Sequence, residues 1–313
     1  MRRRRVRVDR MRRHGICREL IALGWLIALI SAAPFAQTPG SVTAEPTQTT
    51  TQTGEALFQS ACAACHGADG RGAPRPAVGF DVPLPDFTDC GFATAEPDPD
   101  WIAVVHEGGP IRGLDRHMPA FGSALSPEEI LLAIGHVRSF CTESWPRGDL
   151  NLPRAFVTEK AFPENEAVWT TVLTRRPRSA VSNALVYEQR VGARNQFEIT
   201  APIDFHEGAD GKWVRGLGDV GVAFKRAFHD SIRSGRIIAA GAEVVFPTGT
   251  ESVGLGGGDT IVEPFAMWGQ MLPRNSFLQM HGGIELPAHP DRTSRELFLP
   301  SACGVPALDG RGP

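Results

Sequence analysis

The sequence has little excess charge and lacks the motifs of the common enzyme classes. Its net charge at pH 7 is only −3 over 313 residues, so charge alone indicates no nucleic-acid partner. From residue 180 onward we find no nucleotide-binding loop, no nucleophile elbow and no cluster of metal-ligating residues. These absences argue against a catalytic C-terminal half, so the functional residues are expected in the N-terminal half.

The N-terminus carries the most concentrated positive charge in the chain. Arginines crowd the first 18 residues, an almost entirely apolar stretch follows at residues 21–30, and small residues come next. This order is typical of a secretory signal peptide, so residues 1–36 are predicted to direct export to the periplasm and then to be removed, together with Cys17. An uncleaved membrane anchor is the alternative, but Pro34 interrupts the apolar run before the roughly 20 residues that a spanning helix needs.

Composition divides the remaining chain into four parts. Residues 37–53 consist mostly of Thr, Gln and Pro without an apolar period, which predicts a flexible linker. Residues 54–142 have helical patterns at both ends and a loop-rich middle. Residues 143–180 are interpreted as a connecting segment. Residues 181–313 alternate short apolar and polar positions between Gly, Pro and Asp, and are predicted to form an antiparallel β domain.

The most specific motif is C-x-x-C-H at Cys62, Cys65 and His66. Two cysteines at this spacing can form thioether bonds to the vinyl groups of a haem, and the histidine that follows can bind the iron. A zinc site would need a second Cys/His pair at ligand spacing, and a thioredoxin-like site would need a βαβ pattern; the sequence has neither. The motif therefore predicts one covalently attached haem c.

A second axial ligand to the iron must come from elsewhere in the chain. Met118 lies in the run Arg116–Phe121 and is followed by Pro119, which would stiffen the loop that presents the sulfur. A thioether ligand raises the reduction potential of the iron relative to a second histidine. His117 and His106 are the alternative ligands, and Met118 is the favoured one.

With these motifs in place, residues 54–142 resemble a class I cytochrome c domain. The resemblance is carried by a helix from Gly54, the C-A-A-C-H motif, the glycine-rich turn after it, the Met118-Pro119 loop, and a closing helix whose start is marked by Ser126, Pro127 and two acids.

The resemblance implies a small helical shell around the haem, in which the first and last helices cross. It implies that Phe58 contacts the last helix near Gly135 or His136, where a small residue would allow close approach. It also implies that four residues hold the haem and its iron: Cys62, Cys65, His66 and Met118.

Cys90 and Cys141 do not belong to the common pattern of that family. Cys90 lies in the long loop and Cys141 at the end of the last helix. An oxidising compartment would allow them to pair, and we predict a disulfide that ties the loop to the helix. Two buried thiols are the alternative. The sequence leaves the role of Cys303 open.

The C-terminal part shows a period of two. Three runs, 218–228, 238–246 and 276–286, each carry one apolar and one polar face. They fit either a soluble β-sandwich, with its apolar face inside, or an outer-membrane barrel, with its apolar face toward lipid. The length of the runs favours the barrel, because strands of about 9–11 residues cross a bilayer at a tilt. The resemblance to transporter-like outer-membrane barrels is weak.

The number of strands is a difficulty for a complete barrel. We count about seven strands between residues 184 and 300, whereas bacterial barrels have an even number of at least eight. The sequence therefore predicts a truncated barrel or a sheet that is not a barrel.

Together these features predict a multidomain protein, an all-α cytochrome c domain followed by an antiparallel β-sheet. Its expected function is electron transfer through a single haem c, between redox partner proteins, in the periplasm and in association with the outer membrane. The chain is expected not to be an enzyme itself. Two alternatives are a haem domain that supplies electrons to a periplasmic enzyme, and a barrel transporter with an appended cytochrome.

Overall fold

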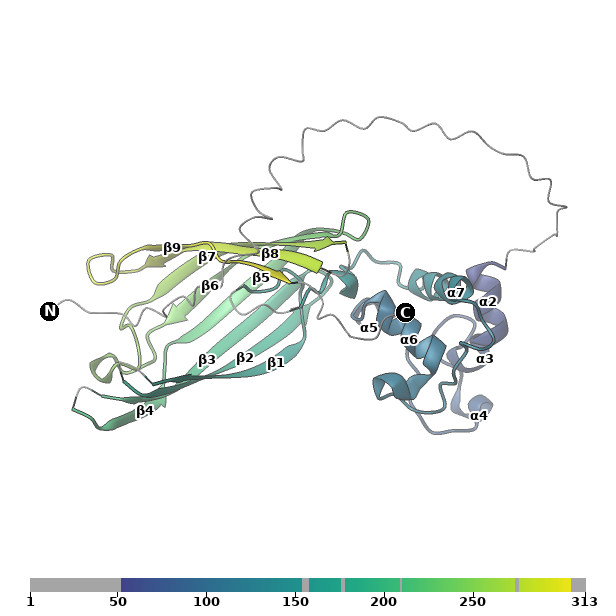
Figure 1. The fold of residues 1–313 in the computed structure, drawn as a ribbon, viewed down its shortest axis with the longest axis horizontal. Helices are drawn as coiled ribbons and strands as arrows, with labels where there is room; N and C mark the ends of the chain where they lie inside the picture. Colours follow the sequence, from purple (N-terminus) through teal and green to yellow (C-terminus); the bar gives the residue numbers. More distant parts are fainter. Residues whose placement is uncertain (1–51, 154–157, 176–177, 209, 274–275, 305–313) are drawn as a thin grey trace, which may run out of the picture. The chain divides into compact units, whose positions relative to one another are not determined.

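The computed structural model describes residues 52–153, 158–175, 178–208, 210–273 and 276–304. The predicted signal peptide, Cys17 and nearly all of the predicted linker lie outside these residues. The described chain begins with a helical region and continues as a curled antiparallel sheet (Figure 1). No helix of the described residues is both long enough and apolar enough to cross a membrane.

The helical region contains short helices separated by turns. Its elements are α2 (Gly54–Ala61), α3 (Ala63–His66), α4 (Arg75–Val78), α5 (Cys90–Ala93), α6 (Asp98–Glu107), the 3₁₀ turn η2 (Gly109–Arg112) and α7 (Pro127–Ser139). A further 3₁₀ turn, η3 (Gly148–Leu150), follows. The start of α7 agrees with the sequence: Ser126 accepts a hydrogen bond from the Glu129 amide, and the Glu129 side chain accepts one from the Ser126 amide.

Helices α2 and α7 pack against each other at a very short distance. Phe58 of α2 is completely buried, and its ring lies 5.3 Å from His136 and 5.2 Å from Phe140. The small residue that permits the approach is Gly54, because a Cβ there would lie 2.1 Å from the carbonyl oxygen of Leu132. The prediction placed this role on Gly135, but a Cβ at Gly135 would meet open space.

The β region is a single ten-stranded sheet. Its strands are β1 (Glu166–Thr174), β2 (Ala180–Val191), β3 (Asn195–Glu207), β4 (Trp213–Leu217), β5 (Val220–Ser231), β6 (Arg236–Phe246), β7 (Ile261–Leu272), β8 (Ser276–Pro287), β9 (Glu296–Phe298) and β10 (Ser301–Gly304). Neighbours follow the order β1-β2-β3-β5-β6-β7-β8-β10, with β4 beside β3 and β9 beside β8. All pairs are antiparallel, and the sheet curls into a half-barrel (Figure 1).

This sheet corrects two sequence-based expectations. It begins at Glu166, inside the predicted 143–180 connecting segment, and it has more strands than the seven that we counted. β1 is missed because its run Thr170-Thr171-Val172 breaks the apolar alternation that marks the later strands. The β-sandwich alternative does not hold for the described residues, since every described strand belongs to one sheet.

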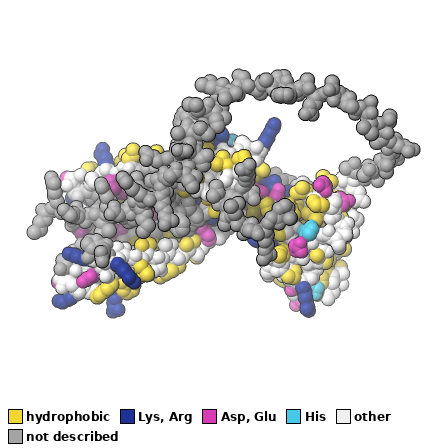
Figure 2. Space-filling model, viewed as in Figure 1, with side chains coloured by type: hydrophobic (Ala, Val, Ile, Leu, Met, Phe, Trp, Pro, Cys, Tyr) yellow, Lys and Arg dark blue, Asp and Glu magenta, His cyan; other side chains and the backbone are white. Residues whose placement is uncertain are grey.

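The two faces of the half-barrel differ in polarity. Apolar side chains such as Phe224 and Phe228 on β5 point outward and are 50% and 64% exposed. Between them, Lys225 points inward and is only 5% exposed. Figure 2 shows hydrophobic side chains at the surface over the described strands. Exposed apolar and buried charged positions are the reverse of the pattern expected for a sheet in a soluble sandwich.

Part of the chain before β1 packs against the inward face of the sheet. We call residues 146–153 and 158–164 the inner segment. Leu150 and Phe162 of this segment are buried in one apolar cluster with Ile237 of β6 and Met267 of β7. The ammonium group of Lys225 donates hydrogen bonds to the carbonyl oxygens of residues 160 and 162, at 2.7 and 3.3 Å. The inner segment therefore fills space inside the half-barrel.

Candidate functional site

The C-x-x-C-H motif lies at the junction of α2 and α3. Cys62 ends α2, and the amides of Cys65 and His66 both donate hydrogen bonds to its carbonyl oxygen, at 3.2 and 3.0 Å. This single turn holds the two thiols and the imidazole next to one another. Gly67 follows with a φ of 73°, a conformation that favours glycine, and lets the chain turn away from the helix.

The loop after the motif folds back onto it. The amide of Gly72 donates to the carbonyl oxygen of His66, and that of Ala73 to the carbonyl oxygen of Cys65, both at 2.8 Å. These bonds fix the backbone of Cys65 and His66 against the following loop. The motif is therefore held rigidly by the turns before and after it, as a site that binds a large planar group would require.

The side chains of the motif are chemically suited to a covalent haem. Cys62 and Cys65 are not joined to each other by a disulfide, so both thiols are available. Burial and the neighbouring Cys65 raise the pKa of the Cys62 thiol. Burial lowers the pKa of His66, which keeps its imidazole neutral at pH 7. The Nδ1 of His66 is buried and has no hydrogen-bond partner among the described residues, as expected if this ring serves a group that the protein alone does not provide.

Aromatic side chains surround the histidine. The Phe87 ring lies 4.9 Å from the His66 ring and in turn contacts Trp101 at 5.7 Å and Phe92 at 6.4 Å. Phe87 is buried, and Phe92 is nearly half exposed. The indole Nε1 of Trp101 is buried without a hydrogen-bond partner in the described chain. The sequence analysis missed Phe87 and Trp101, because the first lies in an irregular loop and neither shares a periodic pattern with the motif.

Met118 lies in a separate loop whose backbone is well held. Its carbonyl oxygen accepts a hydrogen bond from the Gly109 amide at 2.9 Å, and its own amide donates to Asp115 at 3.2 Å. A Cβ on Gly109 would lie 2.2 Å from the Asp115 carbonyl oxygen, so only glycine fits there. The Met118 side chain is half-buried.

The two alternative ligands, His117 and His106, each have partners of their own. The Nδ1 of His117 lies 2.6 Å from Asp115, and its ring stacks on Phe80 with 4.4 Å between the centroids. The Nδ1 of His106 lies 2.7 Å from Glu107. Met118 has no such side-chain partner among the contacts of the described residues.

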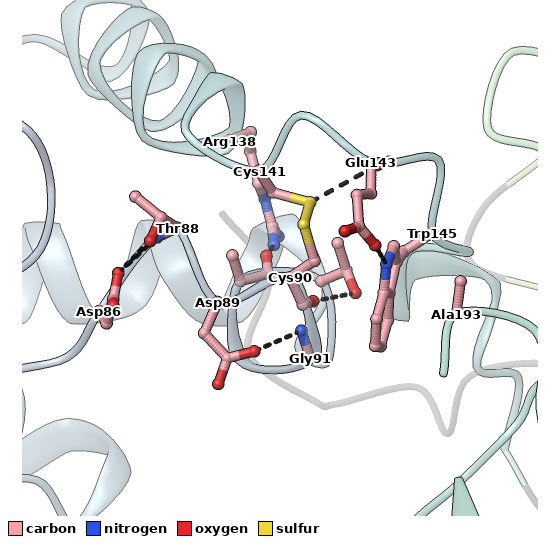
Figure 3. Close-up of a disulfide and its surroundings, with 12 residues drawn as sticks. Asp86, Thr88, Asp89, Cys90, Gly91, Arg138, Cys141, Glu143, Trp145 and Ala193 are labelled. Carbon is pink, nitrogen blue, oxygen red and sulfur yellow. Dashed lines mark hydrogen bonds between the residues drawn. A yellow bond between two sulfur atoms is a disulfide. The ribbon is translucent and has the colours of Figure 1, made fainter. Parts of the chain in front are cut away.

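Cys90 and Cys141 form a disulfide, with 5.0 Å between their Cα atoms. Cys90 begins α5 and Cys141 follows α7, so the bond ties the long loop to the last helix, the arrangement that the sequence predicted (Figure 3). Beside it, the guanidinium group of Arg138 donates to the carbonyl oxygen of Ala93 and, at 2.9 Å, to Asp98. The disulfide and this arginine together fix the loop segment around α5 that follows Phe87.

Comparison with known proteins agrees with this geometry. Residues 49–137 match the family described as cytochrome C oxidase, cbb3-type, subunit III, whose matched part is a c-type cytochrome domain. No curated protein matches the chain. The matched residues include the C-x-x-C-H motif, the aromatic residues around it and nearly all of α7. From residue 49 to residue 137, the chain is a c-type cytochrome domain.

Proposed function

We propose that this protein is a monohaem electron carrier that is exported and held at the outer membrane by its half-barrel. The observation that carries the electron-transfer role is the half-buried His66 imidazole, whose Nδ1 has no hydrogen-bond partner among the described residues, next to two thiols that form no disulfide with each other. A haem c held there would supply an iron that alternates between Fe(III) and Fe(II). The chain itself would exchange electrons with redox partner proteins and transform no substrate.

Met118 is proposed as the second axial ligand. Pro119, which stiffens the loop after Met118, supports this assignment. The contacts of His117 and His106 with carboxylates do not count against either histidine, because each uses Nδ1 and leaves Nε2 available to iron. The closed backbone around Gly109 supports it as well, because a weak thioether ligand benefits from a loop that is already ordered before binding.

The reversed polarity of the half-barrel supports attachment to a membrane. Strands β2, β5, β7 and β8 are each 12 residues long, enough to cross a bilayer at a tilt. Large apolar side chains are exposed on these strands, as lipid requires, while Glu188, Lys225 and Gln279 are buried. The inner segment occupies the interior, which favours a tether over the alternative of a transport passage.

The haem assignment is tested by spectroscopy of purified variants. We expect the wild-type protein to retain its haem after acid–acetone extraction and denaturation, and the double variant Cys62→Ser/Cys65→Ser to retain none. Met118→Ala should keep the covalent haem but lose the weak red-edge absorption band of oxidised His/Met haem. If the band survives in Met118→Ala, the ligand is another residue; if haem remains bound in the double variant, the attachment site is wrong.

Membrane attachment is tested by fractionation of cells that produce the full chain. We expect haem-stained protein in the outer-membrane fraction, resistant to carbonate and high salt and released only by detergent. A cytochrome that leaves the cells on osmotic shock, without detergent, would contradict the tether and leave the haem assignment standing.

A further inference from the structure

A row of glutamates crosses the inward face at the start of the half-barrel. The strand register places Glu166 of β1 directly opposite Glu188 of β2, and Glu188 directly opposite Glu198 of β3. Like charges directly opposite each other destabilise a sheet. Protons or a cation at this row would therefore stabilise the sheet.

The carboxylates are closest where the inner segment meets the first two strands. Oxygen atoms of Glu164, Glu166 and Glu188 all lie within 4.8 Å of one another. Glu188 is only 3% exposed, and its Oε2 is buried with no hydrogen-bond partner among the described residues. Its Oε1 accepts a hydrogen bond from Gln196 at 3.1 Å. A buried carboxylate oxygen without a donor is costly, so its position in this cluster calls for a further partner.

Two lysines of the described residues lie near these carboxylates. Lys160 lies 2.7 Å from Glu164 and forms an ion pair with it, with both side chains largely buried. Lys225 attracts Glu188 but directs its hydrogen bonds to backbone carbonyl oxygens of the inner segment. Burial raises the pKa of Glu188 to about 8; Lys225 opposes this rise, and the neighbouring glutamates add to it.

We propose that Glu164, Glu166 and Glu188 bind a divalent cation, with Ca²⁺ as the best fit. The ligands are all oxygens, as hard cations require, and two oxygens on opposite sides of one Ca²⁺ lie roughly 4.6–5.2 Å apart. Mg²⁺ usually keeps several of its waters, whereas a site closed by protein oxygens beside the buried Glu188 suits Ca²⁺.

Asn151 provides a further oxygen beside this site. Its Nδ2 donates to Glu164 at 3.0 Å, while its Oδ1 is buried without a hydrogen-bond partner in the described chain. Neutral amide oxygens are common Ca²⁺ ligands alongside carboxylates. The bound ion would connect Glu164 and Asn151 of the inner segment to β1 and β2. It would therefore hold the inner segment inside the half-barrel.

The test is calcium titration of the purified full-length protein, with its haem, after removal of metals by a chelator. We expect isothermal titration calorimetry to show one Ca²⁺ bound by the wild type and at least tenfold weaker binding by Glu188→Gln. The matched control is Glu263→Gln, because Glu263 is a glutamate of β7 that lies outside the cluster. This variant should bind Ca²⁺ as tightly as the wild type does. Calcium should also raise the thermal midpoint of the wild type and of the control, but not that of Glu188→Gln.

The haem spectrum and circular dichroism verify that each variant is folded, and Glu166→Gln replaces Glu188→Gln if the latter fails to fold. Absence of both binding heat and a thermal shift in the wild type at millimolar Ca²⁺ would overturn the proposal. So would equal affinity in the wild type and in the cluster variants. A Glu188→Gln variant that is more stable than a calcium-insensitive wild type would show that Glu166 and Glu188 share a proton instead. None of these outcomes depends on the haem or on the membrane.

Discussion

The helical region and the half-barrel differ in the side chains that they bury and expose. In the helical region the interior is apolar, with Phe58 and Ile130 completely buried between α2 and α7. In the half-barrel, Glu188, Gln196 and Lys225 are among the most buried residues, and large apolar side chains are exposed. The first pattern is that of a domain surrounded by water. In the second, the large apolar side chains of the outer face gain from the hydrophobic effect only if that face meets an apolar phase, because they would otherwise remain hydrated.

The same comparison shows how each region is held together. The helical region relies on close packing at Gly54 and on the covalent link between Cys90 and Cys141. The half-barrel relies on continuous backbone ladders and on polar contacts with the inner segment, such as those of Lys225. A mutation that is severe in one region should therefore be mild in the other, and the following predictions test that contrast.

Phenylalanine truncation should give the largest difference between the two regions. Phe58→Ala removes a completely buried ring, and we expect it to lower the free energy of unfolding by about 3–5 kcal/mol. Phe228→Ala removes a ring that is 64% exposed on the outer face of β5, and should change it by no more than about 0.5 kcal/mol in detergent. Denaturant titrations of both variants measure this. Similar losses in both would mean that the outer face is packed against protein.

Loss of the disulfide should destabilise only the helical region. Cys90 and Cys141 are 51 residues apart, and opening a loop of that length costs about 2–4 kcal/mol. We expect Cys90→Ser/Cys141→Ser to lower the unfolding midpoint of the helical region, measured by absorbance of the haem Soret band. The unfolding midpoint of the β-sheet, measured by circular dichroism, should stay the same. An unchanged Soret midpoint would show that the loop is held without the bond.

The buried carboxylates of the half-barrel should make its stability depend on pH. Burial, and then Glu263, raise the pKa of Glu243 from 4.5 to about 7. Between these values the folded state keeps a proton that the unfolded state has lost, so stability falls as the pH rises from about 4.5 to 7 and then levels off. For Glu243 the change should be about 1–3 kcal/mol. Glu243→Gln should flatten this part of the profile relative to the wild type; a parallel profile would contradict the assignment.

Local sequence signals predicted much of the helical region and part of its site. The C-x-x-C-H spacing places Cys62, Cys65 and His66 on one turn, because it is a property of consecutive residues on a helix. The capping residues at Ser126 likewise predict the start of α7. The aromatic partner Phe87 and the close approach at Gly54 were not predicted, since they depend on how separate segments pack.

In the half-barrel the alternating pattern predicted two faces, and only the length of the runs favoured an outward apolar face. An alternating pattern shows which residues share a face of the sheet. It does not show which of the two faces lies inside. The curl of the sheet decides this, by placing Lys225 and Glu188 inside and Phe228 outside. The sequence predicted the inner segment only as part of a connecting segment. Its contacts with β5 and β8 join residues more than 60 positions apart, so no local pattern could indicate them.

What the sequence by itself determined is the covalent chemistry: two thiols and a histidine at fixed spacing. Such spacing survives in any fold that keeps the turn helical. What only the tertiary structure decided is which charges meet. Glu164, Glu166 and Glu188 come together because a strand register and the inner segment align them, and that alignment depends on long-range backbone hydrogen bonds rather than on any local pattern.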